Sequence, residues 1–381
     1  MTTLDDLNFI KSKIEQSAQP WAGEFERLKA KISRAGMTLH NPAAQNNVGG
    51  GKLIYCGGYN KSKDGVNTVV ACNWPVEDGI DAYTLALVGY LSGDEAYSND
   101  ALRYLRSWAN PANFAGFDPA GSNAKLQAGW TIPWYANTAE ILRYTYSEWK
   151  DSDRIAVTGL LNRLLPDVIK DSEGAPNNWL HSRIEAHMAA AIFFDDRAMF
   201  YKAISRWKEH TRSYIYIASD GAGPVLPKSS QAGSRGAANW STPKFFPGQT
   251  METCRDLNHQ GLGMRSIFNS LAMTVNQGED ILTDTDNRER LIAFLTTQPR
   301  WALSKQDHPD GVCNNPIIVT PGNPPDYLRN TAAYAGYPIA YKILSSSSQP
   351  LKAAKDHIEK DGPITASKWV TKWETLTHYK P

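Results

Sequence analysis

The fold is decided by residues 177–217, which read NNWLHSRIEAHMAAAIFFDDRAMFYKAISRWKEHTRSYIYI. Apolar side chains recur there every three to four positions in two blocks, near 179–194 and 197–217, and this period predicts two amphipathic helices. The acidic pair Asp195-Asp196 separates the blocks and predicts the turn between them. We therefore expect two consecutive helices that pack antiparallel, each burying one face against the other.

A similar arrangement occurs earlier in the chain. Gly93-Asp94 follows one helical block and Ala101 lies in the next, as Ala203 follows Asp195-Asp196. Acidic turns are common by themselves, but this repetition at equal spacing indicates an array of stacked helix pairs.

Helical periodicity also dominates the rest of the chain. Further helices are expected near residues 3–34, 80–91, 102–108, 135–149, 153–170, 259–277, 286–303 and 331–345. Only Tyr214–Ile217 and Ile317–Thr320 alternate like short strands. Two long irregular segments, 38–76 and 219–258, are expected to form walls or lids of a site, because long loops in a compact domain are usually functional. No linker or shift in composition marks a boundary, so we expect one all-α domain over residues 1–381.

Composition and charge narrow the possible partners. The chain has 381 residues, of which 41% are hydrophobic and 21% charged, with a formal net charge of +1. That is the composition of a globular protein with a sizeable core. A balanced charge gives no sign of a nucleic-acid partner, and no apolar run approaches the roughly 20 residues that span a bilayer. We expect neither nucleic acid nor membrane as a partner, whereas a few cations lining one cleft suffice for an acidic glycan.

The cysteines leave two readings open. No pair has CxxC spacing among Cys56, Cys72, Cys254 and Cys313. Cys56 and Cys72 bracket a Gly- and Asn-rich loop, and either a disulfide in an oxidising compartment or four buried thiols fits this spacing. His181 and Glu185 share one helical face, but no third ligand follows at a spacing typical of zinc sites. We expect no metal and no other cofactor.

Aromatic residues stand beside amides at several places that flank loops. The chain has 12 Trp and 17 Tyr, and the pairings are Asn73-Trp74, Gln127-Ala-Gly-Trp130, Asn177-Asn178-Trp179 and Asn239-Trp240. Sugar rings have apolar faces and hydroxyl edges, so sugar sites combine aromatic platforms with amides and acids. A single Trp more often fills a core, but four such pairings favour sugar binding. Asn177 or Asn178 is also a good N-cap candidate.

The densest polar cluster joins the second long loop to a helix. It reads Met251-Glu252-Thr-Cys-Arg255-Asp256-Leu-Asn-His259, which combines acids, a cation and a base that titrates near neutrality. A capped helix with a surface ion pair is the structural alternative. A later stretch, from Arg329 through Tyr334 and Tyr337, adds a cation and phenols, which packing alone can also explain.

These segments resemble the alginate-lyase-like superfamily. The resemblance is carried by Asn-Trp, Ile-Glu-Ala, Phe-Asp-Asp-Arg-Ala-Met-Phe and Tyr-Ile-Tyr-Ile-Ala-Ser-Asp-Gly within 177–221, by Leu126-Gln-Ala-Gly-Trp130 and by Glu252-Thr-Cys-Arg-Asp-Leu-Asn-His259. It covers roughly residues 55–345. The sequence is most similar to polysaccharide lyase family 38 and more distantly similar to family 5.

The resemblance implies an (α/α) toroid, an incomplete α/α barrel of antiparallel helix pairs whose long loops form the cleft. It also implies eliminative cleavage of alginate (polymannuronate) or glucuronan without an obligatory metal. It further implies secretion. The start of the chain shows no signal peptide, so either the protein is cytosolic or the signal peptide has been removed. Because of the resemblance we expect the second, a secreted or periplasmic protein. The expected partner is an acidic polysaccharide, and we expect a monomer.

The resemblance also implies roles for individual residues. Asn178 would bind the uronate carboxylate, His259 would be the base, and a late Tyr beside an Arg would be the acid. Tyr334 and Tyr337, which follow Arg329, are the candidates for this acid. Further contacts to the glycan are expected from Gln127, Trp130, Trp179, Glu185, Glu252 and Arg255.

Elimination at a uronate explains why such groups are needed. The C5 proton is weakly acidic because the adjacent carboxylate resists further negative charge, so an amide or cation must neutralise that carboxylate. A base must then reach the C5 proton, and an acid must protonate the departing O4. Asn178 with Arg255 or Arg329 meets the first need, and a cation near Tyr can lower its pKa toward a useful range.

Two other classes of protein share these features. A glycoside hydrolase would act through two carboxylates, and Asp81, Glu185, Glu252 and Asp256 are available. A non-catalytic glycan-binding protein would use the same aromatic platforms. A lyase product carries a C4–C5 double bond that absorbs ultraviolet light. A hydrolase product lacks this double bond, and a binding protein forms no product.

Overall fold

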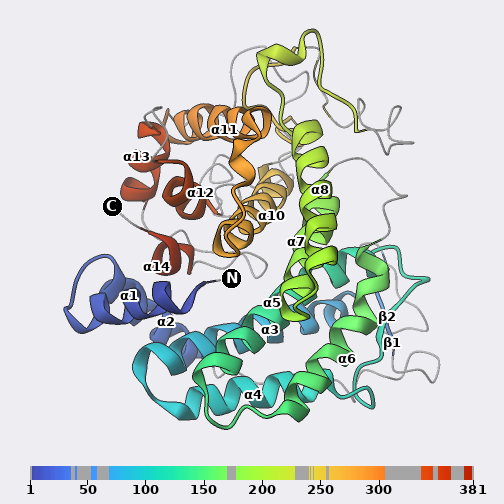
Figure 1. The fold of residues 1–381 in the computed structure, drawn as a ribbon, viewed down its shortest axis with the longest axis vertical. Helices are drawn as coiled ribbons and strands as arrows, with labels where there is room; N and C mark the ends of the chain where they lie inside the picture. Colours follow the sequence, from blue (N-terminus) through green and yellow to red (C-terminus); the bar gives the residue numbers. More distant parts are fainter. Residues whose placement is uncertain are drawn as a thin grey trace. The chain divides into compact units, whose positions relative to one another are not determined.

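The computed structural model describes residues 2–35, 39–40, 53–57, 68–169, 177–227, 240, 242, 244–254, 257–304, 336–345, 351–361 and 373–379. The chain divides into two compact units. Unit 1 comprises Met1–Lys170 and Glu185–Phe200, and unit 2 comprises Asp171–Ile184 and Tyr201–Pro381. Helix α7 (Asn178–Phe193) therefore begins in unit 2 and ends in unit 1 (Figure 1). The expectation of one domain over residues 1–381 stays a prediction.

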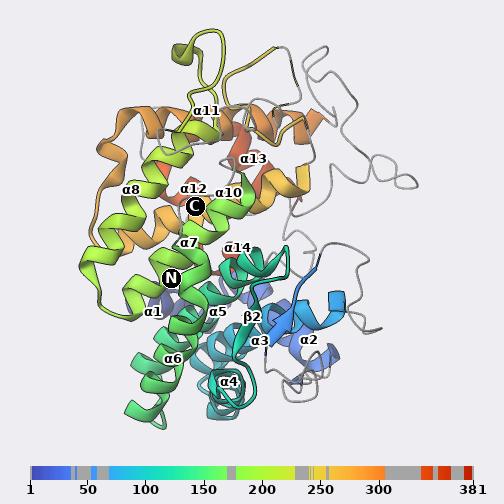
Figure 2. The same ribbon diagram turned by 90° about the vertical axis from the view of Figure 1, so that its right-hand side faces the viewer.

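Unit 1 is built from consecutive helices. They are α1 (Leu4–Glu15), α2 (Trp21–Ala35), α3 (Thr68–Ser92), α4 (Glu95–Ala109), α5 (Ala124–Thr145) and α6 (Asp151–Val168). Helix α3 packs against both α4 and α5, and α6 also contacts α4 and α5 (Figure 2). Helix α4 shows how the sequence sets an element: the Asp94 Oδ1 atom accepts a hydrogen bond of 3.0 Å from the Ala96 N–H and caps the helix. Leu102, Leu105 and Trp108 form its buried stripe.

A disulfide joins two parts of unit 1. Cys56 and Cys72 are bonded, which decides between the two readings that their spacing left open. Cys56 follows strand β1 (Leu53–Tyr55), which pairs in parallel with β2 (Gly116–Asp118), and Cys72 lies in the first turns of α3. The bond therefore ties this small sheet to the helices. Cys254 is also disulfide-bonded, and Cys313 lies outside the described residues.

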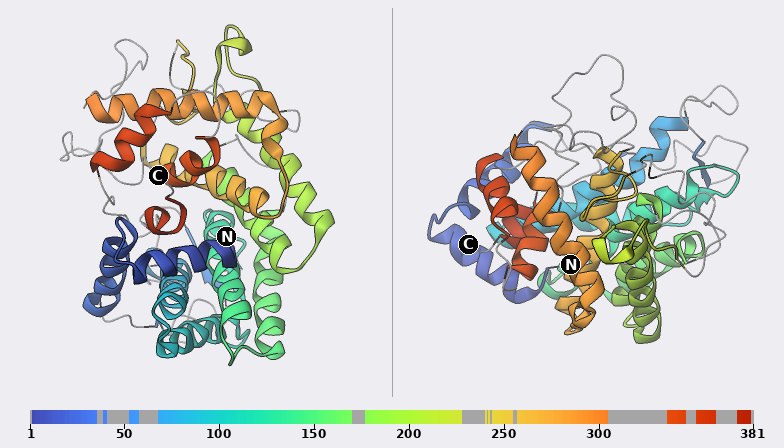
Figure 3. Two further views of the ribbon diagram at one scale, coloured as in Figure 1. Left: turned by 60° about the vertical axis from the view of Figure 1, so that its left-hand side comes forward. Right: turned by 90° about the horizontal axis from the view of Figure 1, so that it is seen from above.

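Unit 2 contains the remaining helices, including α8 (Arg197–Tyr214) from Tyr201 onward. After α8 come α10 (Leu257–Asn276), α11 (Thr285–Ser304), α12 (Tyr337–Leu344), α13 (Lys352–Asp361) and α14 (Glu374–His378). Helix α12 packs against α10, α13 and α14, and α11 packs against α13 (Figure 3). Within the described residues, every helix is too short or too polar to span a lipid bilayer.

The expected helices are present, with corrections at their ends. Helices α3 and α5 begin at Thr68 and Ala124, well before the expected starts near 80 and 135. Residues 68–76 are therefore helical, not part of an irregular segment. Both helices contain a proline, Pro75 or Pro133, and packing on several sides maintains the helix around it.

The expected strands and the C-terminal helices also differ between prediction and structure. Tyr214–Ile217 is not a strand: Tyr214 ends α8, and Ile215 forms an isolated antiparallel bridge with Thr250. Ile317–Thr320 lies outside the described residues. Helices α13 and α14 were not expected, because they are short and carry few apolar positions from which a period can be recognised.

Candidate functional site

The first turn of α7 separates the roles of two neighbouring asparagines. The Asn177 Oδ1 atom accepts hydrogen bonds from the backbone N–H groups of Trp179, at 3.1 Å, and Leu180, at 3.3 Å. Asn177 is therefore the N-cap. The side chain of Asn178 is fully buried, whereas Trp179 is partly exposed. The cap leaves the amide of Asn178 available for another partner.

That partner is the carboxylate of Glu252. The Asn178 backbone N–H donates to Glu252 Oε2 at 3.0 Å, and Asn178 Nδ2 donates to Glu252 Oε1 at 2.6 Å. The Tyr214 hydroxyl donates to Glu252 Oε2 at 2.8 Å. All three residues are completely buried and belong to unit 2. The carboxylate that the Asn178 amide binds in this structure belongs to the protein, and the expected contact with a uronate carboxylate stays a prediction.

His181 borders the same network. Its ring lies edge-on to the ring of Tyr214, with centroids 4.7 Å apart. Burial lowers the pKa of His181 well below its usual range, and the neighbouring His210 lowers it further. Neither ring nitrogen has a hydrogen-bond partner in the part of the chain that the structure describes. The imidazole is therefore neutral and keeps both nitrogens for hydrogen bonding.

The turn that carries Glu252 is tied to the start of α10. Gln260 is fully buried, and its Oε1 atom accepts from the hydroxyls of Thr253, at 2.6 Å, and Thr250, at 3.2 Å. His259, the expected base, precedes Gln260 and is partly exposed. The structure therefore places His259 and Glu252 in neighbouring segments of unit 2 that Gln260 connects. Arg255 and Asp256 lie outside the described residues.

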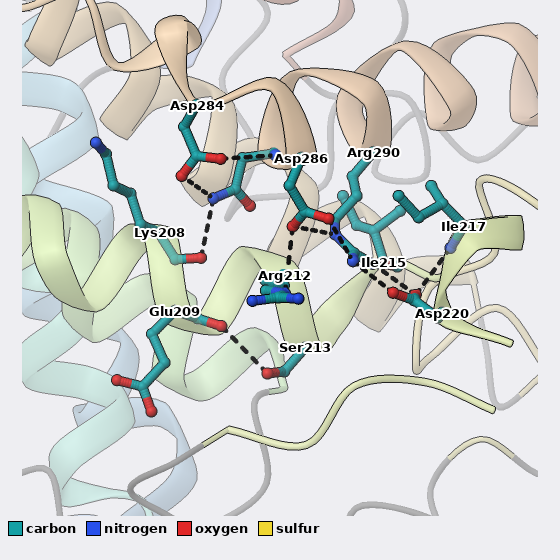
Figure 4. Close-up of polar contacts among 11 residues, drawn as sticks. Lys208, Glu209, Arg212, Ser213, Ile215, Ile217, Asp220, Asp284, Asp286 and Arg290 are labelled. Carbon is teal, nitrogen blue, oxygen red and sulfur yellow. Dashed lines mark hydrogen bonds and ion pairs between the residues drawn. The ribbon is translucent and has the colours of Figure 1, made fainter.

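An ion network holds the segment that follows α8. Arg290 of α11 is fully buried and forks onto Asp220, at 2.7 and 2.6 Å, while also contacting Asp286, at 3.0 and 2.9 Å (Figure 4). It donates to the Ile215 carbonyl as well, at 2.5 Å, and Asp220 accepts from the Ile217 N–H at 3.1 Å. Residues 215–220 are thus fixed to α11 next to Tyr214, the residue that contacts Glu252.

The other expected site residues lie in different places. Tyr337 is the first residue of α12 and is 1% exposed, with its ring against Phe294 and His357 in an aromatic cluster of unit 2. Arg329 and Tyr334 lie outside the described residues.

Three expected glycan contacts belong to unit 1. Gln127 and Trp130 are on α5, where Gln127 is buried and Trp130 partly exposed. Glu185 is buried on α7, two turns after Asn178. Of the expected site residues, Asn178 and Glu252 are thus in direct contact. His259 lies at the start of α10, next to Gln260, which is hydrogen-bonded to the turn that carries Glu252.

Sequence reasoning did not assign roles to Tyr214 or His181. His181 follows Asn178 by three positions, which on a helix places both on one face, and this spacing was available as a signal. Tyr214 gave no such signal, because its contact with Glu252 spans 38 positions of the chain. Among the described residues, no group of three or more His, Cys, Asp or Glu side chains could hold a metal ion.

Comparison with known proteins adds a family and a fold. A family model described as alginate lyase matches residues 29–228, more than half of the chain. The solved structure of alginate lyase A1-III from Sphingomonas species A1 is similar at 15% identity, with a TM-score of 0.58 and coverage of 99% of this chain and 95% of that chain. No curated protein matches the chain.

Two variants of alginate lyase A1-III, each solved with a tetrasaccharide, are also similar. A His-to-Ala variant has 15% identity, a TM-score of 0.60 and coverage of 99% of this chain and 94% of that chain. A Tyr-to-Phe variant has 14% identity, a TM-score of 0.59 and coverage of 99% and 95%. At this identity the likeness is one of fold, and it confirms the expected all-α class of the (α/α) toroid type.

Proposed function

The chain belongs to the alginate lyase family and is a polysaccharide lyase, and from this premise we propose that it cleaves a (1,4)-linked polyuronate, alginate or glucuronan, by β-elimination. The family match over residues 29–228 is the observation that carries the proposal. The tetrasaccharide complexes of alginate lyase A1-III support an oligosaccharide ligand for this fold.

Carboxylate neutralisation is assigned to Asn178. Its Nδ2 group makes one hydrogen bond in the described residues, to Glu252, and an amide nitrogen carries two hydrogens. We propose the second hydrogen for the substrate carboxylate; Asn178 is 0% exposed in this structure, so the residues that cover it must move for the two groups to meet. Arg255 or Arg329 would supply the positive charge that an amide lacks.

Proton transfer is assigned to a His and a Tyr. His259 is partly exposed at the start of α10, so its imidazole has access to a bound sugar and would remove the C5 proton. Tyr334 or Tyr337 would protonate O4 of the leaving chain. Tyr337 is buried in the aromatic cluster of unit 2, and Tyr334 lies outside the described residues.

Glycan contacts are assigned to the remaining residues with suitable chemistry. Trp179 is partly exposed directly after Asn178 and would form an aromatic platform next to the reacting sugar. Gln127, Trp130 and Glu185 are proposed as further contacts.

The proposal extends to the compartment and the oligomeric state of the protein. We propose a secreted or periplasmic protein, because the Cys56–Cys72 disulfide suits an oxidising compartment. We also propose that it acts as a monomer.

An absorbance assay on a panel of polyuronates tests the proposed function. Polymannuronate, polyguluronate and glucuronan would each be incubated with the protein, and a rise in ultraviolet absorbance from the C4–C5 double bond is expected with at least one of them. Heat-denatured protein is the control. New reducing ends without this absorbance would show hydrolysis, and binding without new ends would show a non-catalytic protein; either result contradicts the proposal.

A further inference from the structure

The carboxylate of Glu252 is enclosed by protein donors. Its side chain is 0% exposed, Oε1 accepts from Asn178 Nδ2, and Oε2 accepts from both the Asn178 backbone N–H and the Tyr214 hydroxyl. We propose that Glu252 is a positioning residue, which orients the amide of Asn178 toward the substrate carboxylate and does not itself touch the glycan. The inference rests on the proposed function, since it concerns a residue of the same site.

The geometry fixes which end of the Asn178 amide meets Glu252. A carboxylate accepts hydrogen bonds, so it selects the nitrogen of the Asn178 side chain and turns Oδ1 away from itself. Because the same carboxylate also binds the backbone N–H of Asn178, side chain and backbone are held together. A charge-assisted bond of 2.6 Å is short, which restricts rotation of the amide. Without this partner, the amide could present its oxygen to the uronate, and two acceptors would repel each other.

Glu252 is itself held from three sides. The Tyr214 hydroxyl at the end of α8 fixes Oε2, and Gly263 of α10 lies so close to this hydroxyl that a Cβ at position 263 would overlap it. The Met251 N–H donates to the Tyr214 carbonyl at 2.9 Å, and the Glu252 N–H donates to the Thr250 hydroxyl at 3.3 Å. An acid held this firmly forms a rigid support for Asn178 and has no freedom to follow a substrate.

A positioning role predicts that the effects of substitutions at Glu252 and Asn178 on kcat are not additive in free energy, and a double-mutant cycle measures this. Glu252→Gln keeps the size of the side chain but replaces one acceptor by a donor, and kcat is expected to fall about 10- to 100-fold with KM changed by less than about threefold, because a misplaced group costs rate. In an Asn178→Ala background, the same change is expected to lower kcat by less than about threefold, since no amide remains to be oriented.

Two further variants provide a second cycle and a control. Tyr214→Phe removes one donor to Glu252 without touching Asn178, so its effect should also vanish in the Asn178→Ala background; this cycle replaces the first should Glu252→Gln fail to fold. Asp153→Asn is the matched control, because it converts a buried acid of unit 1, paired with Arg106 and outside the network, to an amide. It should lower the free energy of unfolding while leaving kcat and KM within about twofold.

The outcomes separate the two proposals. If wild-type protein is active and the losses from Glu252→Gln and Asn178→Ala multiply, or if Glu252→Gln mainly raises KM, then Glu252 contacts the glycan directly and the positioning role is wrong. If wild-type protein is inactive on every polyuronate, the proposed function fails and the positioning role fails with it.

Discussion

At the scale of single residues, the same chemical type has different roles according to its surroundings. His181 is buried and kept neutral, whereas His259 is partly exposed at the start of α10. A base must reach its substrate, so exposure distinguishes the two imidazoles. Asn177 and Asn178 also have different roles. The Asn177 side chain accepts hydrogen bonds from backbone N–H groups of its own helix, whereas Asn178 binds a carboxylate 74 positions away in the chain.

His259→Ala tests the base. Activity on the responsive polyuronate is expected to fall by about 10²- to 10⁴-fold, the usual contribution of a positioned base, while the melting temperature changes little because the side chain is not fully buried. Initial rates of ultraviolet absorbance and a thermal melt measure both effects. Full activity in this variant would exclude His259 as the base.

Glu140 of unit 1 predicts a pH-dependent stability. Burial raises the pKa of its carboxyl to about 7 from the usual value of 4.5, and Arg143, at 3.3 Å, only partly opposes this. A raised carboxyl pKa means that ionisation of Glu140 disfavours the fold, so the contribution of this group to the free energy of unfolding is fully present below about pH 4.5 and is lost as the pH rises through about 7.

Glu140→Gln removes that titration. Relative to wild type, the variant is expected to gain stability between pH 4.5 and pH 8, by at most about 3 kcal/mol, since the side chain is 18% exposed and Arg143 loses its partner. Urea unfolding at several pH values measures this difference. Glu15→Gln, on an exposed position of α1, is the control and should show no such trend. A constant difference across this pH range would contradict the assignment.

At the scale of elements, side chains that join distant segments decide where the site residues lie. Asp94 and Asn177 begin helices through contacts within two or three residues, which spacing along the chain reveals. Arg290 instead connects α11 to residues 215–220, across 70 positions of sequence. Such a contact fixes the segment next to Tyr214, and with it the support of Glu252.

Arg290→Met tests this connection. Removing the guanidinium leaves the Asp220 carboxylate, 3% exposed, without its cation, and a buried charge left alone costs about 3–5 kcal/mol. Urea unfolding should show this loss, and adding Asp220→Asn in the same chain should recover part of it, because the uncompensated charge is then gone. A loss below about 1 kcal/mol would show that the network contributes little to stability.

At the scale of the whole molecule, the two units differ in what they contribute. Unit 2 contains the network of Asn178, Tyr214 and Glu252, whereas unit 1 contains the Cys56–Cys72 disulfide and the helices that carry Gln127 and Trp130. Helix α7 runs through both, so its sequence serves the site at one end and the core of unit 1 at the other.

Replacing both Cys56 and Cys72 by Ser tests the covalent link in unit 1. The cysteines are 16 positions apart, and a loop of this length is stabilised by about 3 kcal/mol on the entropic model. A lower melting temperature is expected for the double variant, and addition of a reductant should lower that of wild type at least as far, because the disulfide of Cys254 is reduced as well. Comparing masses of alkylated protein with and without reduction counts the linked thiols. Free thiols at both positions in the non-reduced protein would contradict the bond.

The sequence by itself determined the helical period, the acidic turns, the pair of Asn residues that includes the cap, and the family. Each of these depends on residues close together in the chain, where spacing translates directly into geometry. Only the tertiary structure decided that Asn178 meets Glu252 and Tyr214, that His181 is neutral and that Pro75 and Pro133 lie inside helices. These features arise from contacts between distant segments and from burial, and neither has a period or spacing that a single sequence displays.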